Sequence, residues 1–463
     1  MNRRTFLKTA GAVPPALSAE PPARKPNVIW IFGDQHRAQA MGCAGDPNAH
    51  TPHLDTMAAQ GVRFTAAVSG MPLCCPFRGS LVTGRYPHHC VPGHEYPLPE
   101  GQQTIAHVFR GAGYHTGYFG KWHLAGIHES EGRSALRPVP PAKRGGFDTW
   151  VGYDNNNSQY DCWVQGGAGK DAFHYRLPGY ETDELTNLFI KYIREQAAAK
   201  RPFFAALSVQ PPHNPYVAPP EFMGRHTPAR IELRPNVPRI APVVETARRD
   251  LAGYYAQIEN LDWNVGRVRK VLEEAGIAMN THILFFSDHG DMHGSHGQYK
   301  KMTAYQESIG IPFLIGGGQP HGYEGWGAGA FRVPLNHVDI SATTLGLCGI
   351  EKPEWMEGTD YSHYRLRGRK RGGEPDSAFL QSVVPTMHGD SVDKPWRGIV
   401  TRDGWKYCCF EGVSWVMFNL NEDPYELVNV AHNSKYRAER RRLVSRLREW
   451  IAGSGDKFNV PEA

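Results

Sequence analysis

The chain has 463 residues, of which 40% are hydrophobic and 21% charged, as in an ordinary globular protein with a large core. Its formal net charge is +5, and Arg3, Arg4 and Lys8 supply three of these charges. The remaining excess is small, and no basic helix is interleaved with aromatic residues. These features exclude a typical nucleic-acid-binding protein.

The first residues are typical of an export signal. Arg3-Arg4 followed by Phe6-Leu7-Lys8 fits the twin-arginine pattern. The apolar stretch behind it is short and interrupted by Pro14-Pro15, whereas a membrane-spanning helix needs about 20 apolar residues. We expect residues 1–25 to be a twin-arginine signal and linker, the protein to be exported to the periplasm, and no segment to span a membrane. A disordered tail with a chance Arg-Arg is the alternative.

Apolar strands alternate with helices along residues 26–365. The predicted elements are, in chain order, a strand at Asn27–Phe32, helices at Thr51–Gly61 and Thr104–Gly113, strands at His115–Gly120 and Phe203–Val209, a helix at Val244–Ala275 and a strand at Thr281–Ser287. This alternation predicts an α/β domain with a mostly parallel sheet flanked by helices. The ligand site of such a sheet lies at the carboxyl ends of its strands.

Residues 366–463 predict a smaller C-terminal subdomain. The basic, Gly-rich stretch Arg365–Asp376 reads as a linker. Strand-like segments follow at Gly398–Val400, Trp405–Phe410 and Trp415–Asn419, and a basic amphipathic helix covers about Lys435–Ile451. We expect a small antiparallel sheet covered by one helix.

The eight cysteines fit neither a zinc pattern nor a disulfide framework, so most are expected to be reduced, buried thiols. Cys74 and Cys75 are unusual because they are adjacent and precede Pro76 and Arg78. We expect this segment, MPLCCPFRGSLVTGRYPHHC, to form a turn rich in Pro, Gly and Arg.

Polar residues with catalytic potential follow the buried strands. Asp34-Gln35, His213 and Asp288 come directly after three of them, so the fold would bring them to one rim of the sheet. The stretch SDHGDMHGSHG at Ser287–Gly297 offers carboxylates and imidazoles that can converge on a cation. Lys121, His123 and Lys301 offer charge for an anion. Taken singly, each has a plainer reading as loop polarity, a hydrogen-bonded turn or a surface lysine.

Together these segments resemble the formylglycine-dependent sulfatases of the alkaline-phosphatase superfamily. The Cys-x-Pro-x-Arg signature of that family matches Cys74, Pro76 and Arg78. The matching segments, in family order, are NVIWIFGDQHR, TPHLDTMAAQGVRF, GYFGKWHLAG, PPHNPY, YYAQIENLDWNVG, SDHGDMHGSHG, KMTAYQESIGIPFLI and NLNEDPYELVNVA. The resemblance spans roughly Pro26 to His432 and implies an alkaline-phosphatase-like fold.

The resemblance implies that a formylglycine-generating enzyme oxidises Cys74 to an aldehyde, Cα-formylglycine (3-oxoalanine). Hydrated, the aldehyde carries two hydroxyls: one attacks the sulfur of a sulfate ester, and the other later expels sulfate. Cys75 fills a variable position of the signature and is expected to be a spectator. Phe77 replaces a small residue that is common in the family.

Further residue roles are carried over by position. Asp34, Gln35, Asp288, His289 and modified Cys74 match the metal-ligand positions. Many family members have Asp where this chain has Gln35, and Asn where it has His289. Oxygen ligands favour Ca²⁺, and the His289 nitrogen leaves Mn²⁺ or Mg²⁺ open. Arg78 and Lys121 would neutralise the aldehyde hydrate and sulfate oxygens, and Lys301 would hold the sulfate. His123 would act as base and His213 as acid.

Two other functions stay open at this point: a phosphate or phosphonate monoester hydrolase that uses the same site, and a carbohydrate-binding or scaffold protein with an inactive site. The substrate is expected to be a sulfated carbohydrate or a small sulfate ester. Three segments are candidates for the pocket border, namely Trp150–Trp163, Pro219–Arg249 and Trp396-Arg397.

Overall fold

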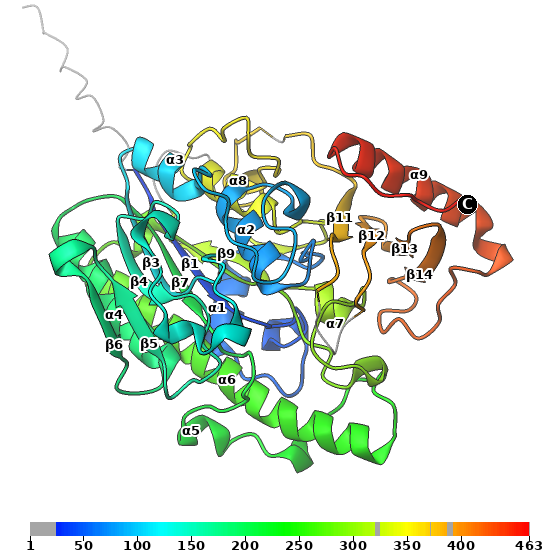
Figure 1. The fold of residues 1–463 in the computed structure, drawn as a ribbon, viewed down its shortest axis with the longest axis horizontal. Helices are drawn as coiled ribbons and strands as arrows, with labels where there is room; N and C mark the ends of the chain where they lie inside the picture. Colours follow the sequence, from blue (N-terminus) through cyan, green and yellow to red (C-terminus); the bar gives the residue numbers. More distant parts are fainter. Residues whose placement is uncertain (1–24, 320–324, 371, 387–391, 463) are drawn as a thin grey trace, which may run out of the picture.

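The computed structural model describes residues 25–319, 325–370, 372–386 and 392–462 (Figure 1). The predicted export signal therefore lies, apart from Lys25, outside the described residues. Within the described ranges, no helix combines the length and apolar character needed to cross a bilayer.

A ten-stranded sheet forms the centre of the molecule, in the order β10-β2-β9-β8-β1-β7-β3-β4-β5-β6 (Figure 1). The five neighbouring strands from β8 to β4 run parallel to one another. The strands of this sheet are β1 (Asn27–Gly33), β2 (Val62–Phe64), β3 (His115–Lys121), β4 (Thr149–Tyr153), β5 (Trp163–Gly166), β6 (Phe173–Arg176), β7 (Phe203–Val209), β8 (Thr281–Ser287), β9 (Phe313–Gly317) and β10 (Gly329–Phe331). The prediction of a mostly parallel α/β sheet is confirmed.

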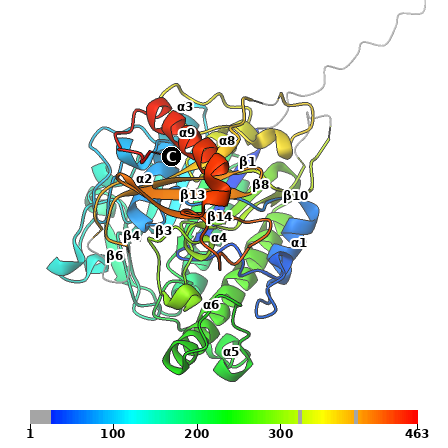
Figure 2. The ribbon, with the colours of Figure 1, turned by 90° about the vertical axis from the view of Figure 1, so that its right-hand side faces the viewer.

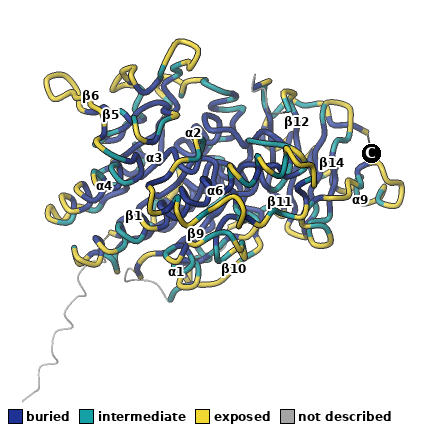
Figure 3. The backbone as a smooth tube through the Cα atoms, turned by 90° about the horizontal axis from the view of Figure 1, so that it is seen from below, coloured by how far each residue is buried: buried dark blue, intermediate teal, exposed yellow. Residues whose placement is uncertain are grey.

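Helices cover both faces of this sheet, as the continuous burial of β1, β7 and β8 requires. One face packs against α2 (Cys74–Thr83), α3 (Ile105–Gly111) and α8 (Asp339–Leu347). The other packs against α1 (Pro52–Gln60), α4 (Glu181–Ala198) and α6 (Ala241–Glu274). Figure 3 shows that burial concentrates along the sheet, while β6 at one end of it is exposed.

Strand register places four strand ends at one edge. Gly33 at the end of β1 pairs with Val209 of β7 on one side and with Ser287 of β8 on the other. Gly120 of β3 pairs with Ser208 of β7. The residues that follow these four strands therefore meet at the same rim, as the sequence predicts for a parallel sheet.

A separate four-stranded antiparallel sheet forms the C-terminal part, with the order β11-β12-β13-β14 (Figure 1; β13 and β14 are also labelled in Figure 2). Its elements are β11 (Ser377–Ser382), β12 (Trp396–Thr401), β13 (Trp405–Phe410), β14 (Val413–Asn419) and the covering helix α9 (Arg437–Gly453). One face of the sheet packs on α9 and the other packs on Val68, Ala304 and Ile309 of the large domain. The predicted antiparallel sheet with one helix is confirmed, whereas the domain boundary at residue 365 stays a prediction.

The basic stretch after Tyr364 differs from a solvated linker. Arg365 is buried, and its guanidinium donates to the carbonyls of Gln60, Gly317, Gly318 and Gly327. Gln60 ends α1 and Gly317 ends β9, so the start of the predicted linker is fixed to the large domain.

Candidate active site

Cys74 is the first residue of helix α2, which corrects the expectation of a turn. Pro76 is compatible with the helix because it stands in the first turn, where its missing N–H costs no hydrogen bond. The helix N-terminus carries positive partial charge, which favours negative charge on a group at Cys74. Arg78 stands one turn further on, so the helix presents both side chains to the same rim. All eight cysteines are free thiols.

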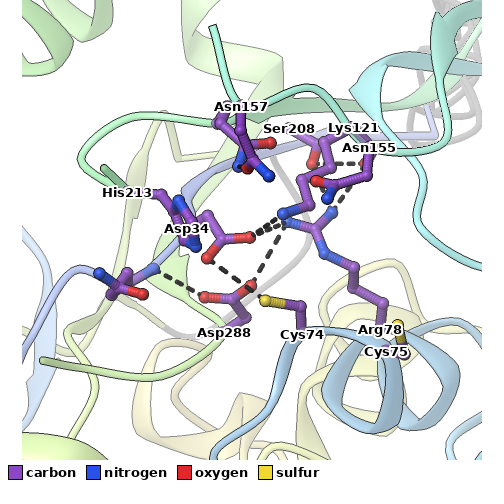
Figure 4. A network of polar contacts seen from close by, with 12 residues as sticks. Asp34, Cys74, Cys75, Arg78, Lys121, Asn155, Asn157, Ser208, His213 and Asp288 are labelled. Carbon is purple, nitrogen blue, oxygen red and sulfur yellow. Dashed lines mark hydrogen bonds and ion pairs between the residues drawn. The ribbon is translucent and has the colours of Figure 1, made fainter. Parts of the chain in front are cut away.

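Three potential ligands, Asp34, Asp288 and His289, lie around the Cys74 sulfur, and Figure 4 shows the two carboxylates beside it. Asp34 Oδ1 lies 3.5 Å and His289 Nε2 lies 3.2 Å from Cys74 Sγ. His289 Nε2 is 3.5 Å from Asp34 Oδ1 and 3.6 Å from Asp288 Oδ1. One donor atom from each of these residues lies within 4.8 Å of all the others, and the four side chains are buried. The first residues after β1 and β8 thus meet the start of α2.

Gln35 and Lys301 complete this cluster. Lys301 Nζ donates to Cys74 Sγ and to Gln35 Oε1, each at 3.2 Å. Gln35 Nε2 donates to Asp291 Oδ2 at 2.6 Å, which directs its oxygen toward the site. Gln35 has φ 73°, a left-handed conformation that non-glycine residues rarely adopt.

Two further cations hold the carboxylates. Lys121 Nζ lies 2.6 Å from Asp34 Oδ2, and Arg78 Nη2 lies 3.3 Å from Asp34 Oδ2 and 3.4 Å from Asp288 Oδ2. Arg78 Nη1 donates to the Lys121 carbonyl and to Ser208 Oγ. Two carboxylates therefore face the cations of Arg78, Lys121 and Lys301. This excess of positive charge suits an anionic ligand.

The pKa values of the two carboxyls are shifted in opposite directions. Burial disfavours the Asp34 carboxylate, but Lys121 and Lys301 outweigh it and hold the pKa of Asp34 well below its usual value. Burial, with the nearby Asp34 charge, raises the pKa of Asp288 to about 7 in the metal-free protein. Burial, then Asp34, likewise raises the pKa of the Cys74 thiol to about 11.

His123 and His213 line the same pocket from the segments that follow β3 and β7. Neither ring nitrogen of buried His123 has a hydrogen-bond partner among the described residues, and its backbone φ is 56°. His213 Nδ1 contacts the carbonyl of Asn214 at 2.7 Å, so its other ring nitrogen remains for a ligand. Burial, followed by Lys121 for His123 and by Lys301 for His213, lowers the pKa of both rings well below the usual value.

The pocket above Cys74 is a cavity of about 170 Å³. Its lining residues are Gln35, Cys74, His94, Lys121, His123, Glu129, Asn155, Asn157, His213, Asn214, Lys300 and Lys301. Sequence reasoning missed His94, Glu129, Asn214 and Lys300. It included Asn155 and Asn157 only as part of the candidate border segment Trp150–Trp163. These polar loop residues carry no periodic signal.

Several segments that the sequence suggested for the site do not contribute to it. Among the described residues, neither Pro219–Arg249 nor Trp396-Arg397 lines the pocket; Trp396 is buried, and Arg397 is paired with Asp456. Only Asp288 and His289 of the stretch SDHGDMHGSHG join the cluster. His293 instead packs on Tyr254, and His296 stacks on Tyr305.

Comparison with known proteins assigns the family. The sulfatase family model matches residues 26–350, and the model for the C-terminal region of N-sulphoglucosamine sulphohydrolase matches residues 294–452. The ulvan-active sulfatase of Formosa agariphila is 34% identical over 453 residues, which cover 94% of this chain and 82% of that protein. The chain belongs to the sulfatase family of the alkaline-phosphatase superfamily, and it is a sulfuric ester hydrolase.

Two solved structures share the fold. One, from work on the metabolism of multiple glycosaminoglycans by Bacteroides thetaiotaomicron, has a TM-score of 0.80 at 25% identity and covers 93% of this chain and 97% of its own. The other, the phosphonate monoester hydrolase of Agrobacterium radiobacter, has a TM-score of 0.74 at 22% identity and covers 93% of this chain and 96% of its own. The second likeness concerns the fold alone.

The donor set fits the divalent metal ion that the family implies. Asp34, Asp288 and Gln35 offer oxygen, and His289 offers an imidazole nitrogen, within the buried cluster. Burial and the neighbouring Asp34 charge disfavour the ionised form of Asp288 in the metal-free protein, and a bound divalent cation would favour that form.

Proposed function

We propose that this protein hydrolyses sulfate esters of a carbohydrate through a formylglycine derived from Cys74. The observation that carries the proposal is the convergence on Cys74 Sγ of Lys301 Nζ and His289 Nε2, each at 3.2 Å, and Asp34 Oδ1 at 3.5 Å. An unmodified thiol with a pKa of about 11 is largely protonated at neutral pH and would be a poor nucleophile. The aldehyde hydrate removes that difficulty.

The chemistry then follows from the positions of the side chains. One hydroxyl of the hydrate forms a bond to sulfur while the bond from sulfur to the ester oxygen breaks. The second hydroxyl then loses its proton, and the carbonyl reforms as sulfate leaves. A serine at position 74 would have no second hydroxyl, so it would stop after the first step. The positive end of α2, Arg78 and Lys121 stabilise the charge that develops on the hydrate.

Two histidines have roles that suit their surroundings. His123 is a neutral base because burial and Lys121 lower its pKa, so it can accept the proton of the remaining hydroxyl. His213 is the proposed acid for the leaving alcohol. After burial, Lys301 is the largest cause of its low pKa, and an anionic ester beside Lys301 would offset that charge and favour protonated His213.

Asp34, Gln35, Asp288, His289 and the modified Cys74 would hold the metal ion. We propose Ca²⁺, with Mn²⁺ or Mg²⁺ as alternatives, because most of these donors are oxygens. The bound ion would lower the pKa of a coordinated hydroxyl and offset negative charge at the reacting group. A titration of chelator-treated protein with each ion, followed by metal analysis and thermal stability, tests this assignment.

A carbohydrate substrate is supported by the lining of the pocket. None of the described lining residues is Phe, Tyr or Trp, and the Asn155, Asn157 and Asn214 amides offer donors and acceptors for hydroxyl groups. Asn155 Oδ1 is buried and has no hydrogen-bond partner among the described residues. The relative named for activity on ulvan is consistent with a polymeric substrate.

The direct test is sulfate release from a panel of defined sulfated oligosaccharides and from an aryl sulfate. Protein co-produced with a formylglycine-generating enzyme is compared with its Cys74→Ala variant. Rates on the matched aryl phosphate separate the rival phosphate or phosphonate hydrolase. That rival remains because Gln35 and His289 do not exclude it. A faster reaction with the aryl phosphate than with the aryl sulfate would show that the natural substrate is a phosphate or phosphonate ester.

We also propose export through the twin-arginine route, which carries folded proteins and would let modification of Cys74 precede export. Arg3 and Arg4 motivate this proposal. Fractionation of cells that produce the Arg3→Lys/Arg4→Lys variant tests it: the variant should remain in the cytoplasm. Equal periplasmic amounts of variant and parent would show that another route is used.

A further inference from the structure

A second cluster of potential ligands lies beside the catalytic one. Cys75, His94 and His123 each present one ligand atom within 4.8 Å of the other two. Cys75 is the second residue of α2 and is buried, while His94 and His123 line the pocket. No role in the proposed reaction uses Cys75 or His94.

The local contacts fit a thiolate and two imidazoles around one ion. The Glu95 N–H donates to Cys75 Sγ at 3.3 Å, an interaction that stabilises a thiolate. The His94 and His123 rings lie edge to face, with centroids 5.7 Å apart at 88°. Both ring nitrogens of buried His123 lack a hydrogen-bond partner among the described residues, so this ring can turn either nitrogen to an ion.

From this geometry we infer that Cys75, His94 and His123 form a binding site for a thiophilic divalent cation such as Zn²⁺, and that the bound ion inhibits the enzyme. Neighbouring ligand atoms around tetrahedral Zn²⁺ are about 3.3–3.7 Å apart, so separations of up to 4.8 Å need to close by up to about 1.5 Å. The His94 side chain is 22% exposed and its Nε2 lies 3.7 Å from Glu95 Oε1, so a rotation of this ring away from Glu95 would supply that adjustment.

The ion would bind at the floor of the pocket and leave the catalytic cluster intact. Binding exchanges the thiol proton of Cys75 for a bond to sulfur and releases that proton to solvent. Three protein ligands leave a fourth position for water on the pocket side. His123 cannot hold this ion and accept a proton in the reaction at the same time. The inhibitory consequence therefore rests on the proposed role of His123, whereas the binding site itself does not.

Cobalt spectroscopy tests the site without any activity. Co²⁺ replaces Zn²⁺ and gives a near-ultraviolet charge-transfer band only when sulfur is a ligand. The Cys74→Ser variant removes the thiol of the catalytic cluster, so a band in that variant should come from Cys75. It should disappear in Cys74→Ser/Cys75→Ser. Absence of the band in the first protein, or its persistence in the second, overturns the site.

Inhibition tests the consequence in the mature enzyme. The Cys75→Ser variant should keep its basal rate, and the Zn²⁺ concentration for half-inhibition should rise by at least about 10-fold. Cys75→Ala also lacks the sulfur and should show the same basal rate and the same rise in the Zn²⁺ concentration for half-inhibition. It serves as a second variant in case Cys75→Ser does not fold. Equal inhibition of parent and both variants overturns the proposed inhibition. If the parent releases no sulfate, the proposed function fails, while the cobalt measurement still decides the site.

Discussion

The Lys121 ammonium nitrogen lies 2.6 Å from Asp34 Oδ2, and the two side chains are 1% and 0% exposed. Lys121 ends β3 and Asp34 follows β1, so the pair joins two strand ends that are separated by β7. The same ammonium lines the pocket. One cation therefore contacts both the metal-ligand cluster and the space for the anionic ester.

Replacing Lys121 should impair turnover severely. The Lys121→Met variant loses a preorganised positive charge in a desolvated site. We expect its kcat to fall by about 10²–10³-fold, as is typical when one such group is removed. Steady-state kinetics on an aryl sulfate measure the effect, and Lys191→Met on the exposed surface of α4 is the matched control. A Lys121→Met enzyme with parental kcat would remove Lys121 from the reaction.

His213 should matter most for poor leaving groups. An alkyl sulfate releases a basic alcohol that needs a proton, so the His213→Ala variant should lose about 10²–10⁴-fold with it. A nitrophenyl sulfate releases a weakly basic phenolate and should lose less than about 10-fold. The measurement is kcat/KM for both esters, with His174→Ala on exposed β6 as control. Equal losses with the two esters would contradict the role of His213 as acid.

Serine at position 74 should trap the first half of the reaction. The Cys74→Ser variant can attack sulfur with one hydroxyl but cannot expel sulfate, because no carbonyl can form. Intact mass measurement after incubation with an aryl sulfate should show one added sulfuryl group, and Cys74→Ala should show none. Continuous turnover by the serine variant would exclude the two-hydroxyl mechanism.

Glu181 should make stability depend on pH. Burial is the main cause that raises its pKa from 4.5 to about 7. Tyr153 Oη and the Gln210 N–H donate to Glu181 Oε1, whereas Oε2 has no hydrogen-bond partner among the described residues. The folded state thus holds a proton that the unfolded chain releases. The contribution to stability is complete below about pH 4.5 and is lost as pH rises to about 7.

The lost contribution amounts to up to about 3 kcal/mol. The Glu181→Gln variant carries no titrating proton, so its stability should fall less than that of the parent between pH 5 and pH 8. Thermal unfolding at both pH values measures the difference, and Glu184→Gln on the same helix is the control. The same fall in Glu181→Gln and parent would show that Glu181 does not retain the proton.

The bounds of three strands could be predicted closely from the sequence. The bounds expected for Phe203–Val209, Thr281–Ser287 and Trp405–Phe410 coincide with β7, β8 and β13. Residues that do not fit a buried strand flank each of these segments, and a short buried segment has few alternatives to a strand. The Cys74 segment was harder because Pro76 suggests a turn, although the first turn of a helix tolerates proline equally well.

The residues of the candidate site that follow strands could be predicted from the sequence, whereas those on loops could not. Parallel strands carry Asp34, His213 and Asp288 to one rim, so the order of strands and polar residues predicts their meeting. His94, Asn155 and Asn157 reach the pocket from loops. Their positions depend on tertiary contacts such as the hydrogen bond from Gln210 Nε2 to Asn157 Oδ1, which no local pattern encodes.

The most direct test of the account is mass spectrometry of the Cys74 peptide from active protein made with a formylglycine-generating enzyme, beside the rate of sulfate release. The account predicts an aldehyde at Cys74, an intact thiol at Cys75 and a rate that rises in proportion to the aldehyde fraction. Full activity in protein that carries only the Cys74 thiol would contradict it.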